Sequence, residues 1–259
     1  MARAKIEEFA QQHPWCCFCG GAIRTQTRDE VPPRSMFLNK EWPEGYQFPA
    51  CKKCNEGSRL DDQLLALFAR MSFLDKHAAS DNIAPFAAGV RNNSPSAFPV
   101  TPDNSDLREI FGEHESRLPK GLPEGAVEIA LVPADSFQRL DSVFQKLFCA
   151  LYYKHLGEII PNQSNLFRLA TTNQILSDDR PYDWMGLPGA TEYPNIFRGN
   201  RSLTDQFDYR WGFDPKDGLF KVVFQLRYSV FGVMVGPIPD RYVSEFEADA
   251  IITTGRSGD

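Results

Sequence analysis

The N-terminal part of the chain contains the stretch Cys16-Cys17-Phe18-Cys19-Gly20-Gly21 and, further on, the stretch Cys51-Lys52-Lys53-Cys54-Asn55. Each stretch has two cysteines separated by two residues, a gap that lets one tight turn direct two thiolates at a single tetrahedral ion. We therefore predict a structural zinc ion bound by Cys16, Cys19, Cys51 and Cys54. Gly20 and Gly21 follow the first pair, where the chain of a zinc knuckle must bend back with positive φ.

Two other uses of four cysteines are open, disulfide bonds and an iron–sulfur cluster. Disulfides are typical of exported proteins, and the N-terminal sequence Met1-Ala2-Arg3-Ala4-Lys5 does not resemble a secretion signal. Iron–sulfur clusters more often have other cysteine spacings. Cys17 could shift the first pair by one position, but only Cys16 reproduces the gap of the second pair. We expect Cys149, on the apolar side of a later helix, to be a buried thiol.

Length and composition indicate an ordinary globular protein with an uneven charge distribution. Of its 259 residues, 42% are hydrophobic and 24% are charged, which excludes wholesale disorder. The apolar stretches are too short to cross a bilayer, so we expect a cytoplasmic protein without a membrane partner. The formal net charge is −6, yet residues 1–60 carry 9 Lys and Arg against 7 Asp and Glu, a balance of +2. A polyanion should therefore meet the N-terminal part.

We predict an α+β fold with three consecutive parts. Residues 1–79 form the zinc module, with a helix at about 3–11 and an amphipathic helix from Ser58, which with Asp61 resembles a capping box. Residues 80–125 form a connector rich in Pro, Asn and Ser, with one short helix near 105–114. Residues 126–259 form an α+β domain of unassigned role.

The third part has the sequence pattern of an antiparallel sheet packed against a helix. Residues 126–132 have the pattern of a strand, and residues 136–155 that of an amphipathic helix ending at Gly157. Strand patterns follow at 207–211 and 222–230, separated by turn residues at 214–218. In the first of these, the alternating aromatic residues could stack on nucleobases, but such residues more often belong to a core. We expect a core position for Phe207, Tyr209 and Trp211.

Between the two cysteine pairs lies Asp29-Glu30-Val31-Pro32-Pro33, and Asn55 directly follows the last cysteine of the second pair. Together with the cysteines, these residues resemble the HNH endonucleases, also called ββα-metal or His-Me finger enzymes, and in particular their zinc-stabilised members. The resemblance covers roughly residues 16–73. It implies a zinc-bound ββα-metal, treble-clef-like module at the N-terminus. It also implies metal-dependent hydrolysis of phosphodiester bonds in nucleic acid, with DNA as the first expectation.

The resemblance assigns roles to individual residues. Asp29 would supply a carboxylate and Asn55 an amide to one catalytic Mg²⁺ or Mn²⁺, hard cations that prefer oxygen ligands. The metal would neutralise the charge that builds up on the scissile phosphate. Arg28, Arg34 and Lys53 would contact phosphates on either side of the bond.

Glu30 occupies the position at which the family has its catalytic histidine. An imidazole titrates near neutral pH, whereas an unperturbed glutamate has a pKa of about 4.3 and is a weaker base. Three interpretations of Glu30 are open. It could be a general base with a raised pKa, it could add a second carboxylate to the metal site, or it could indicate that the site has lost its cleavage activity and kept its fold. A histidine from elsewhere could also serve. The chain has four histidines, which are His13, His77, His114 and His155.

The alternative to a nuclease is a non-catalytic zinc module that binds nucleic acid or protein. Taken singly, Asp29 and Glu30 are typical of a solvated turn before two prolines, and Asn55 is typical of a helix start. A shared cation requires the side-chain oxygens of Asp29 and Asn55 to converge on one point. Residues 126–259 would select a target, mediate homodimer formation, contact a protein partner or sense a ligand.

Overall fold

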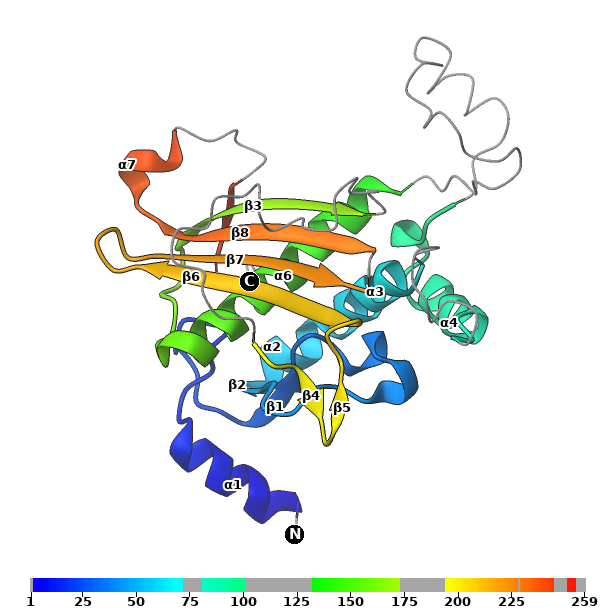
Figure 1. Ribbon diagram of the computed structural model, residues 1–259, viewed down its shortest axis with the longest axis horizontal. Coiled ribbons are helices and arrows are strands. Elements are labelled where there is room, and N and C mark those ends of the chain that lie inside the picture. The colour runs from blue at the N-terminus through cyan, green and yellow to red at the C-terminus, as the bar shows by residue number, and fades with distance from the viewer. Residues whose placement is uncertain are drawn as a thin grey trace.

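The computed structural model describes residues 2–71, 81–100, 132–172, 194–227, 229–244 and 251–254. Within these ranges the protein is a mixture of helices and strands, with a five-stranded antiparallel sheet and a cysteine cluster near the N-terminus (Figure 1). The predicted strand at 126–132, apart from its last residue, and the predicted short helix near 105–114 lie outside the described residues, as do His77 and His114. Among the described residues, none of the helices combines the length and the apolar character that a membrane crossing requires.

The N-terminal elements are small and lie around the two cysteine pairs. In chain order they are α1 (Ala2–Gln12), β1 (Thr27–Glu30), the 3₁₀ helices η1 (Arg34–Met36) and η2 (Leu38–Lys40), β2 (Gln47–Ala50), α2 (Lys52–Gly57) and α3 (Arg59–Arg70). β1 and β2 pair antiparallel, and α2 begins directly after Cys51. The helix predicted at about 3–11 is thus confirmed as α1.

Ser58, at the junction of α2 and α3, has a different role from the predicted helix cap. Its backbone angles are helical, with φ −91° and ψ −4°, and its side chain makes no capping bond. The hydroxyl instead donates to Asp62 Oδ2 over 2.9 Å. The predicted amphipathic helix is confirmed, and its buried residues are Leu64, Leu65, Ala66, Leu67, Phe68 and Ala69.

Part of the predicted connector contributes to the packed structure. Here α4 (Ala84–Asn93) contacts α3, and η3 (Pro95–Ala97) contacts both α4 and α6 (Ala134–Leu156). Val90 and Ala97 are buried at these contacts. This stretch is therefore more than a surface loop, because two of its apolar residues belong to the hydrophobic core.

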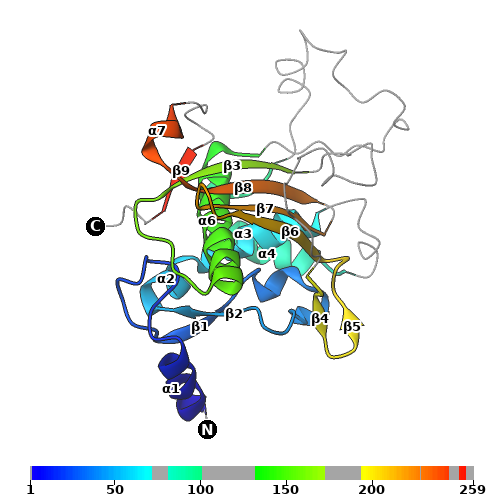
Figure 2. The same ribbon diagram turned by 60° about the vertical axis from the view of Figure 1, so that its left-hand side comes forward.

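The long helix α6 lies against the large sheet, as predicted. Its C-terminal end is capped by Gly157, which has the left-handed φ of 71°. The ring centroids of Phe148 and Phe220 are 5.5 Å apart, and those of Phe144 and Phe224 are 5.6 Å apart. Figure 2 shows α6 beneath the strands, and α3 contacts the same helix. α6 therefore contacts both the sheet and the N-terminal elements.

The strand order of the large sheet is β6-β7-β8-β3-β9. The bounds are β3 (Asn165–Thr172), β6 (Phe207–Asp214), β7 (Leu219–Leu226), β8 (Val230–Ile238) and β9 (Ile251–Thr253); β4 (Phe197–Arg198) and β5 (Arg201–Ser202) form a separate pair, and α7 (Asp240–Val243) follows β8. Phe207 and Tyr209 are fully buried, which confirms the core interpretation for them, and Trp211 is half-buried and packs against the core.

The predicted strand at 222–230 is divided in two by a turn. β7 ends at Leu226 and β8 begins at Val230, and the Ser229 N–H donates to the Leu226 carbonyl over 3.0 Å. Arg227, in this turn, has a φ of 48° and is fully buried. Its guanidinium forms an ion pair with Asp81. Alternation alone did not reveal this turn, because the apolar pattern continues on both sides of it.

The N-terminal elements and the large sheet share one cluster of buried hydrophobic residues. At one contact between them, the hydroxyls of Tyr46 and Tyr209 are 3.0 Å apart, and the Tyr46 and Phe207 rings have centroids 5.7 Å apart. The division into 1–79, 80–125 and 126–259 stays a prediction. One hydrophobic core contains residues of both the first and the last of these parts.

His155, near the end of α6, should make the stability of the protein depend on pH. Its Nε2 lies 2.9 Å from the Tyr209 hydroxyl, its ring stacks on Trp211, and burial lowers the pKa of His155 to about 4. The unfolded chain, with a histidine pKa of about 6.5, binds more protons between these values. This contribution is complete above about pH 6.5 and is lost as the pH falls through about 4.

We expect the urea midpoint of the wild type to fall more steeply than that of His155→Gln when the pH is lowered across this window. Glutamine keeps a hydrogen-bonding group near Tyr209 but does not titrate. Parallel curves for the two proteins would show that other groups cause the pH dependence.

Candidate metal centre and buried charged cluster

The four predicted zinc ligands come together from two separate turns. Cys16 and Cys19 lie in the loop after α1, Cys51 immediately precedes α2, and Cys54 lies within it. Their Sγ atoms all lie within 4.8 Å of one another. A tetrahedral zinc ion, with Zn–S bonds of about 2.3 Å, holds its sulfur atoms roughly 3.8 Å apart. The cluster could therefore hold a metal ion such as zinc after a small contraction.

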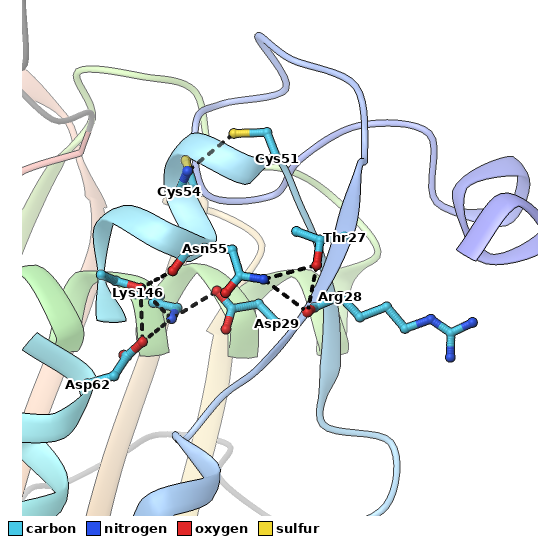
Figure 3. A network of polar contacts seen from close by, with 9 residues as sticks. Thr27, Arg28, Asp29, Cys51, Cys54, Asn55, Asp62 and Lys146 are labelled. Carbon is cyan, nitrogen blue, oxygen red and sulfur yellow. Dashed lines mark hydrogen bonds and ion pairs between the residues drawn. The ribbon is translucent and has the colours of Figure 1, made fainter. Parts of the chain in front are cut away.

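The backbone around the cysteines has the expected form. Gly20 and Gly21 have φ values of 62° and 76°, as predicted for the bend after the first pair. A Cβ atom on Gly20 would lie 2.6 Å from the backbone N of Asn162, so a side chain would collide there. In the second pair, Cys51 Sγ accepts a hydrogen bond from the Cys54 N–H over 3.4 Å and caps α2 (Figure 3).

The electrostatics of the cluster favour a bound cation. The side-chain hydrogen bond between Cys54 and Cys16 lowers the pKa of Cys16 to about 5 and raises the pKa of Cys54. Burial raises the pKa of Cys19 to about 11. One thiolate is thus stabilised by its protonated neighbours, whereas four thiolates at this spacing need a metal ion to offset their repulsion.

The remaining two cysteines lie outside the cluster. Cys17 is buried and its backbone N–H donates to the Pro49 carbonyl over 3.0 Å, and Cys16, not Cys17, belongs to the four-cysteine cluster. Cys149, on α6, is buried as predicted. Burial raises the pKa of both thiols, that of Cys149 to about 12.

Asp29, the predicted carboxylate ligand of a catalytic cation, belongs to a buried charged cluster. Lys146 Nζ, from α6, lies 2.9 Å from Asp29 Oδ2 and 2.8 Å from Asp62 Oδ2. It also donates to Ser58 Oγ over 2.8 Å. Asp29 and Lys146 are 5% and 7% exposed. The ammonium therefore donates hydrogen bonds to Ser58, at the junction before α3, and to Asp62 of α3, and it forms an ion pair with Asp29 of β1.

The members of this charged cluster alter one another's ionisation. Burial raises the pKa of Asp29 to about 6, and Lys146 opposes the rise. Burial alone would lower the pKa of Lys146, but Asp62 and Asp29 raise it above its ordinary value. The lysine therefore stays protonated at neutral pH, and two carboxylates surround one ammonium group.

Asn55 lies in α2 with its side chain directed at β1. Its Nδ2 donates to Thr27 Oγ1 over 3.0 Å and to the Arg28 carbonyl over 3.2 Å. The second contact places the carboxamide next to the peptide bond that joins Arg28 to Asp29 (Figure 3). The structure thus brings Asn55 and Asp29 into one region, with the Asp29 carboxylate turned toward Lys146.

Glu30 lies on the other face of β1. Successive residues of a strand point to opposite faces, and in β1 Asp29 is buried while Glu30 is half-buried. The residue opposite Glu30 in β2 is Gln47, whose Nε2 donates to Glu30 Oε1 over 3.4 Å. The structure therefore does not bring Glu30 to the carboxylate of Asp29. Of the described histidines, His13 contacts the Tyr153 hydroxyl over 2.8 Å and His155 contacts Tyr209.

The predicted phosphate-binding residues Arg28 and Arg34 contact other parts of the chain. The guanidinium of Arg28 lies 4.6 Å from the centroid of the Phe9 ring and donates to the Lys5 carbonyl. That of Arg34 lies 4.3 Å from the centroid of the Trp42 ring and donates to the Lys40 carbonyl over 2.8 Å. Lys53 is exposed on α2 and lines a cleft. Phosphate binding by these residues stays a prediction.

This cleft has a volume of about 690 Å³ and lies between the cysteine cluster, the start of α3 and α6. Cys19, Cys51 and Cys54 line it, and so do Ser58 and Lys146. The zinc-ligand candidates and the buried charged cluster therefore border the same cavity. Sequence reasoning missed the cleft because its walls come from segments about a hundred positions apart.

Sequence reasoning also missed Lys146. One signal was available, since Val143, Leu147 and Ala150 are buried and lie three, one and four positions from Lys146 on the same helix. A lysine next to the apolar face of an amphipathic helix indicates either a snorkelling side chain or a buried ion pair. The helix alone does not identify the partner.

Comparison with known proteins gives no relative. No family model matches the chain, and neither the curated proteins nor the solved structures contain a match.

Proposed function

We propose that this protein is a zinc-stabilised binding protein of the ββα-metal type, in which the ammonium of Lys146 replaces the catalytic cation and hydrolysis is absent. The observation that carries the proposal is the contact of Lys146 Nζ with Asp29 Oδ2, Asp62 Oδ2 and Ser58 Oγ at 2.8–2.9 Å. The order β1, β2, α2, with one cysteine pair before β1 and one around the start of α2, supports the kinship with that type of module.

The ammonium and a divalent cation would compete for the same carboxylate. A magnesium ion binds carboxylate oxygen at about 2.1 Å and keeps most of its water ligands. Lys146 Nζ is already 2.9 Å from Asp29 Oδ2, in a place where both side chains are 6% exposed. Two positive charges this close in a buried site repel strongly. Cation binding would therefore require Lys146 to leave, although Leu147 and Phe148 fix this part of α6 in the core.

Neither Glu30 nor the two described histidines, the candidates for the base that activates water, lies in position to do so at Asp29. His13 and His155 have tyrosine partners elsewhere, and Glu30 faces the other side of β1. General base catalysis requires hydrogen-bonding reach of the water that attacks. The described part of the chain therefore favours a binding role over a hydrolytic one.

A nicking assay on plasmid DNA, extended to single-stranded DNA and RNA, tests the proposal with Mg²⁺ or Mn²⁺ present. We expect no cleavage by the wild-type protein and a metal content of one zinc per chain. Cleavage that disappears in Asp29→Asn would overturn the proposal. Protein that lacks bound zinc would contradict its structural part.

Removal of the lysine should create the cation site that the wild type lacks. In Lys146→Ala, Asp29 and Asp62 lose their counter-charge and a space opens beside them, so we expect Mn²⁺ to bind. Electron paramagnetic resonance of added Mn²⁺ measures the bound fraction. The control is Asp29→Asn in the same Lys146→Ala background, in which binding should again be lost. Equal Mn²⁺ binding by wild type and Lys146→Ala would contradict the replacement of cation by ammonium.

Restoring the family's histidine should not restore cleavage. Because Glu30 contacts Gln47 on the face of β1 away from Asp29, a histidine at this position would be too far from a water at Asp29. We expect Glu30→His to remain inactive in the nicking assay, alone and combined with Lys146→Ala. Metal-dependent cleavage by Glu30→His alone would contradict this prediction, because it would show that the wild-type site lacks only a general base.

HNH-type hydrolysis of nucleic acid is the second candidate. It is favoured by the contact of Asn55 Nδ2 with the Arg28 carbonyl, which places the two predicted cation ligands in one region. This function would require a state in which Lys146 has left Asp29. The nicking assay on the wild type separates the two candidates.

A further inference from the structure

The cleft beside the cysteine cluster has the size and the lining of a binding site. Its volume of about 690 Å³ lies within the usual range for ligand pockets, roughly 300–1,000 Å³. One wall is the zinc knuckle with Phe18 and Ile23, and the opposite wall is α6 with Gln138 and Gln145. These two glutamines are seven positions apart, two turns of the helix, so both project from the same side of α6.

The charges around the cleft select the kind of ligand. Lys53, Arg139 and Lys146 line it, and so do Asp61 and Asp135. Asp29 and Asp62 stand behind Lys146 and add two negative charges. A zinc ion with four thiolates contributes two more. The residues that line the cleft sum to 3 − 2 = +1. Asp29 and Asp62 behind Lys146 change this sum to −1, and a bound zinc ion with four thiolates changes it to −3.

This balance disfavours a phosphate-bearing ligand and favours a cationic one. Arg139, one of the basic residues that line the cleft, forms an ion pair with Asp135, in which Arg139 Nε lies 3.3 Å from Asp135 Oδ2. The amide groups of Gln138 and Gln145 can both donate and accept hydrogen bonds, as the backbone of a peptide requires. Ile23, 38% exposed, supplies an apolar contact at the edge of the cleft.

We propose that this cleft binds a basic segment of a partner protein, with a lysine or arginine side chain against the zinc–thiolate centre and Asp61. The segment's backbone lies along the glutamines of α6, and an apolar side chain contacts Ile23. The inference rests on the proposed function, because the charge balance takes zinc to be bound and the Asp29 site to hold Lys146 instead of a divalent cation.

Fluorescence anisotropy with the full zinc-loaded chain tests this inference. The probes are a short labelled peptide of alternating lysine and leucine, the same peptide with glutamate for lysine, and a labelled single-stranded oligonucleotide of equal length. We expect the lysine peptide to bind most tightly and its affinity to fall as salt is added. Tighter binding of the oligonucleotide would overturn the proposal in favour of nucleic acid.

Two sets of variants locate the binding in the cleft. Asp61→Asn combined with Asp135→Asn should weaken binding of the lysine peptide about tenfold, since each rim charge contributes a modest amount. The matched control is Asp217→Asn, at an exposed position in the turn between β6 and β7, which should leave the affinity unchanged. Gln138 is exposed, so Gln138→Lys should weaken binding and Gln138→Glu should strengthen it without disturbing the fold.

Three results would overturn the inference. The first is no binding of the lysine peptide, the second is equal binding of the lysine and glutamate peptides, and the third is equal affinity in all variants, which would indicate non-specific attraction. Failure of the proposed function gives a different signal, because it shows as metal-dependent cleavage or as missing zinc in the same protein sample.

Discussion

Cys51→Ser is expected to lose the bound zinc and to unfold the N-terminal part of the chain under conditions in which the wild type is folded. Cys51 is fully buried, belongs to the four-cysteine cluster and caps α2 with its sulfur atom. In zinc-finger peptides, binding of the structural ion contributes about 10–16 kcal/mol to folding. Zinc content by mass spectrometry and thermal unfolding by circular dichroism measure the two effects.

The matched control for this variant is Cys17→Ser. Cys17 is also buried and lies next to a ligand in sequence, but its thiol is outside the cluster. A hydroxyl at this apolar position should cost about 1–3 kcal/mol and leave the zinc content at one per chain. A full complement of zinc in Cys51→Ser, or loss of zinc in Cys17→Ser, would contradict the assigned ligands.

Lys146→Met should have the second largest effect, a loss of about 3–5 kcal/mol in the free energy of unfolding at neutral pH. The substitution keeps most of the volume of the side chain but leaves Asp29 and Asp62 without their counter-charge. Without Lys146 the pKa of Asp29 rises further above its value in the unfolded chain, so the folded state binds more protons. The loss of stability that comes from Asp29 should therefore be small at acid pH and grow as the pH rises above about 6, where this carboxyl ionises in the folded wild type. Urea unfolding at several pH values measures it.

Two further proteins separate charge from packing in this experiment. The triple variant Asp29→Asn, Asp62→Asn and Lys146→Met has no buried charge in this cluster and should recover a large part of the lost stability. Lys216→Met removes a lysine from an exposed turn and should change stability by less than about 0.5 kcal/mol. If the triple variant is no more stable than Lys146→Met, packing rather than charge explains the loss.

The parts of this structure that the sequence predicted are those encoded within short segments. The cysteine spacing predicted the four clustered thiols, and the glycines after the first pair predicted a bend with positive φ. Apolar periodicity predicted α3 and α6, and alternation predicted β6 and much of β7. Each of these features is determined by residues close together in the sequence, because they belong to the same turn, helix or strand.

Such local patterns could not predict the buried charged cluster. Lys146 meets Ser58 and Asp62 across 88 and 84 positions, and those contacts depend on how α6 packs against α3. The prediction placed Glu30 beside Asp29 because, in the resemblance to the HNH family, Glu30 occupies the position of the catalytic histidine. In the structure both residues belong to strand β1, and the side chains of successive residues in a strand point to opposite faces of the sheet. A turn at this place would have allowed both carboxylates to face one ion.

The contact between α6 and β1 has a consequence for how this N-terminal segment can be reused. A fragment that ends before α6 would contain all four clustered cysteines, yet it would lack Lys146, whose ammonium lies 2.9 Å from the Asp29 carboxylate and helps to cover it. Transplanted onto another protein, such a fragment would need a new basic residue from its host at the same place. The segment with the four clustered cysteines therefore depends on α6, and a fusion protein built around this segment should include the helix.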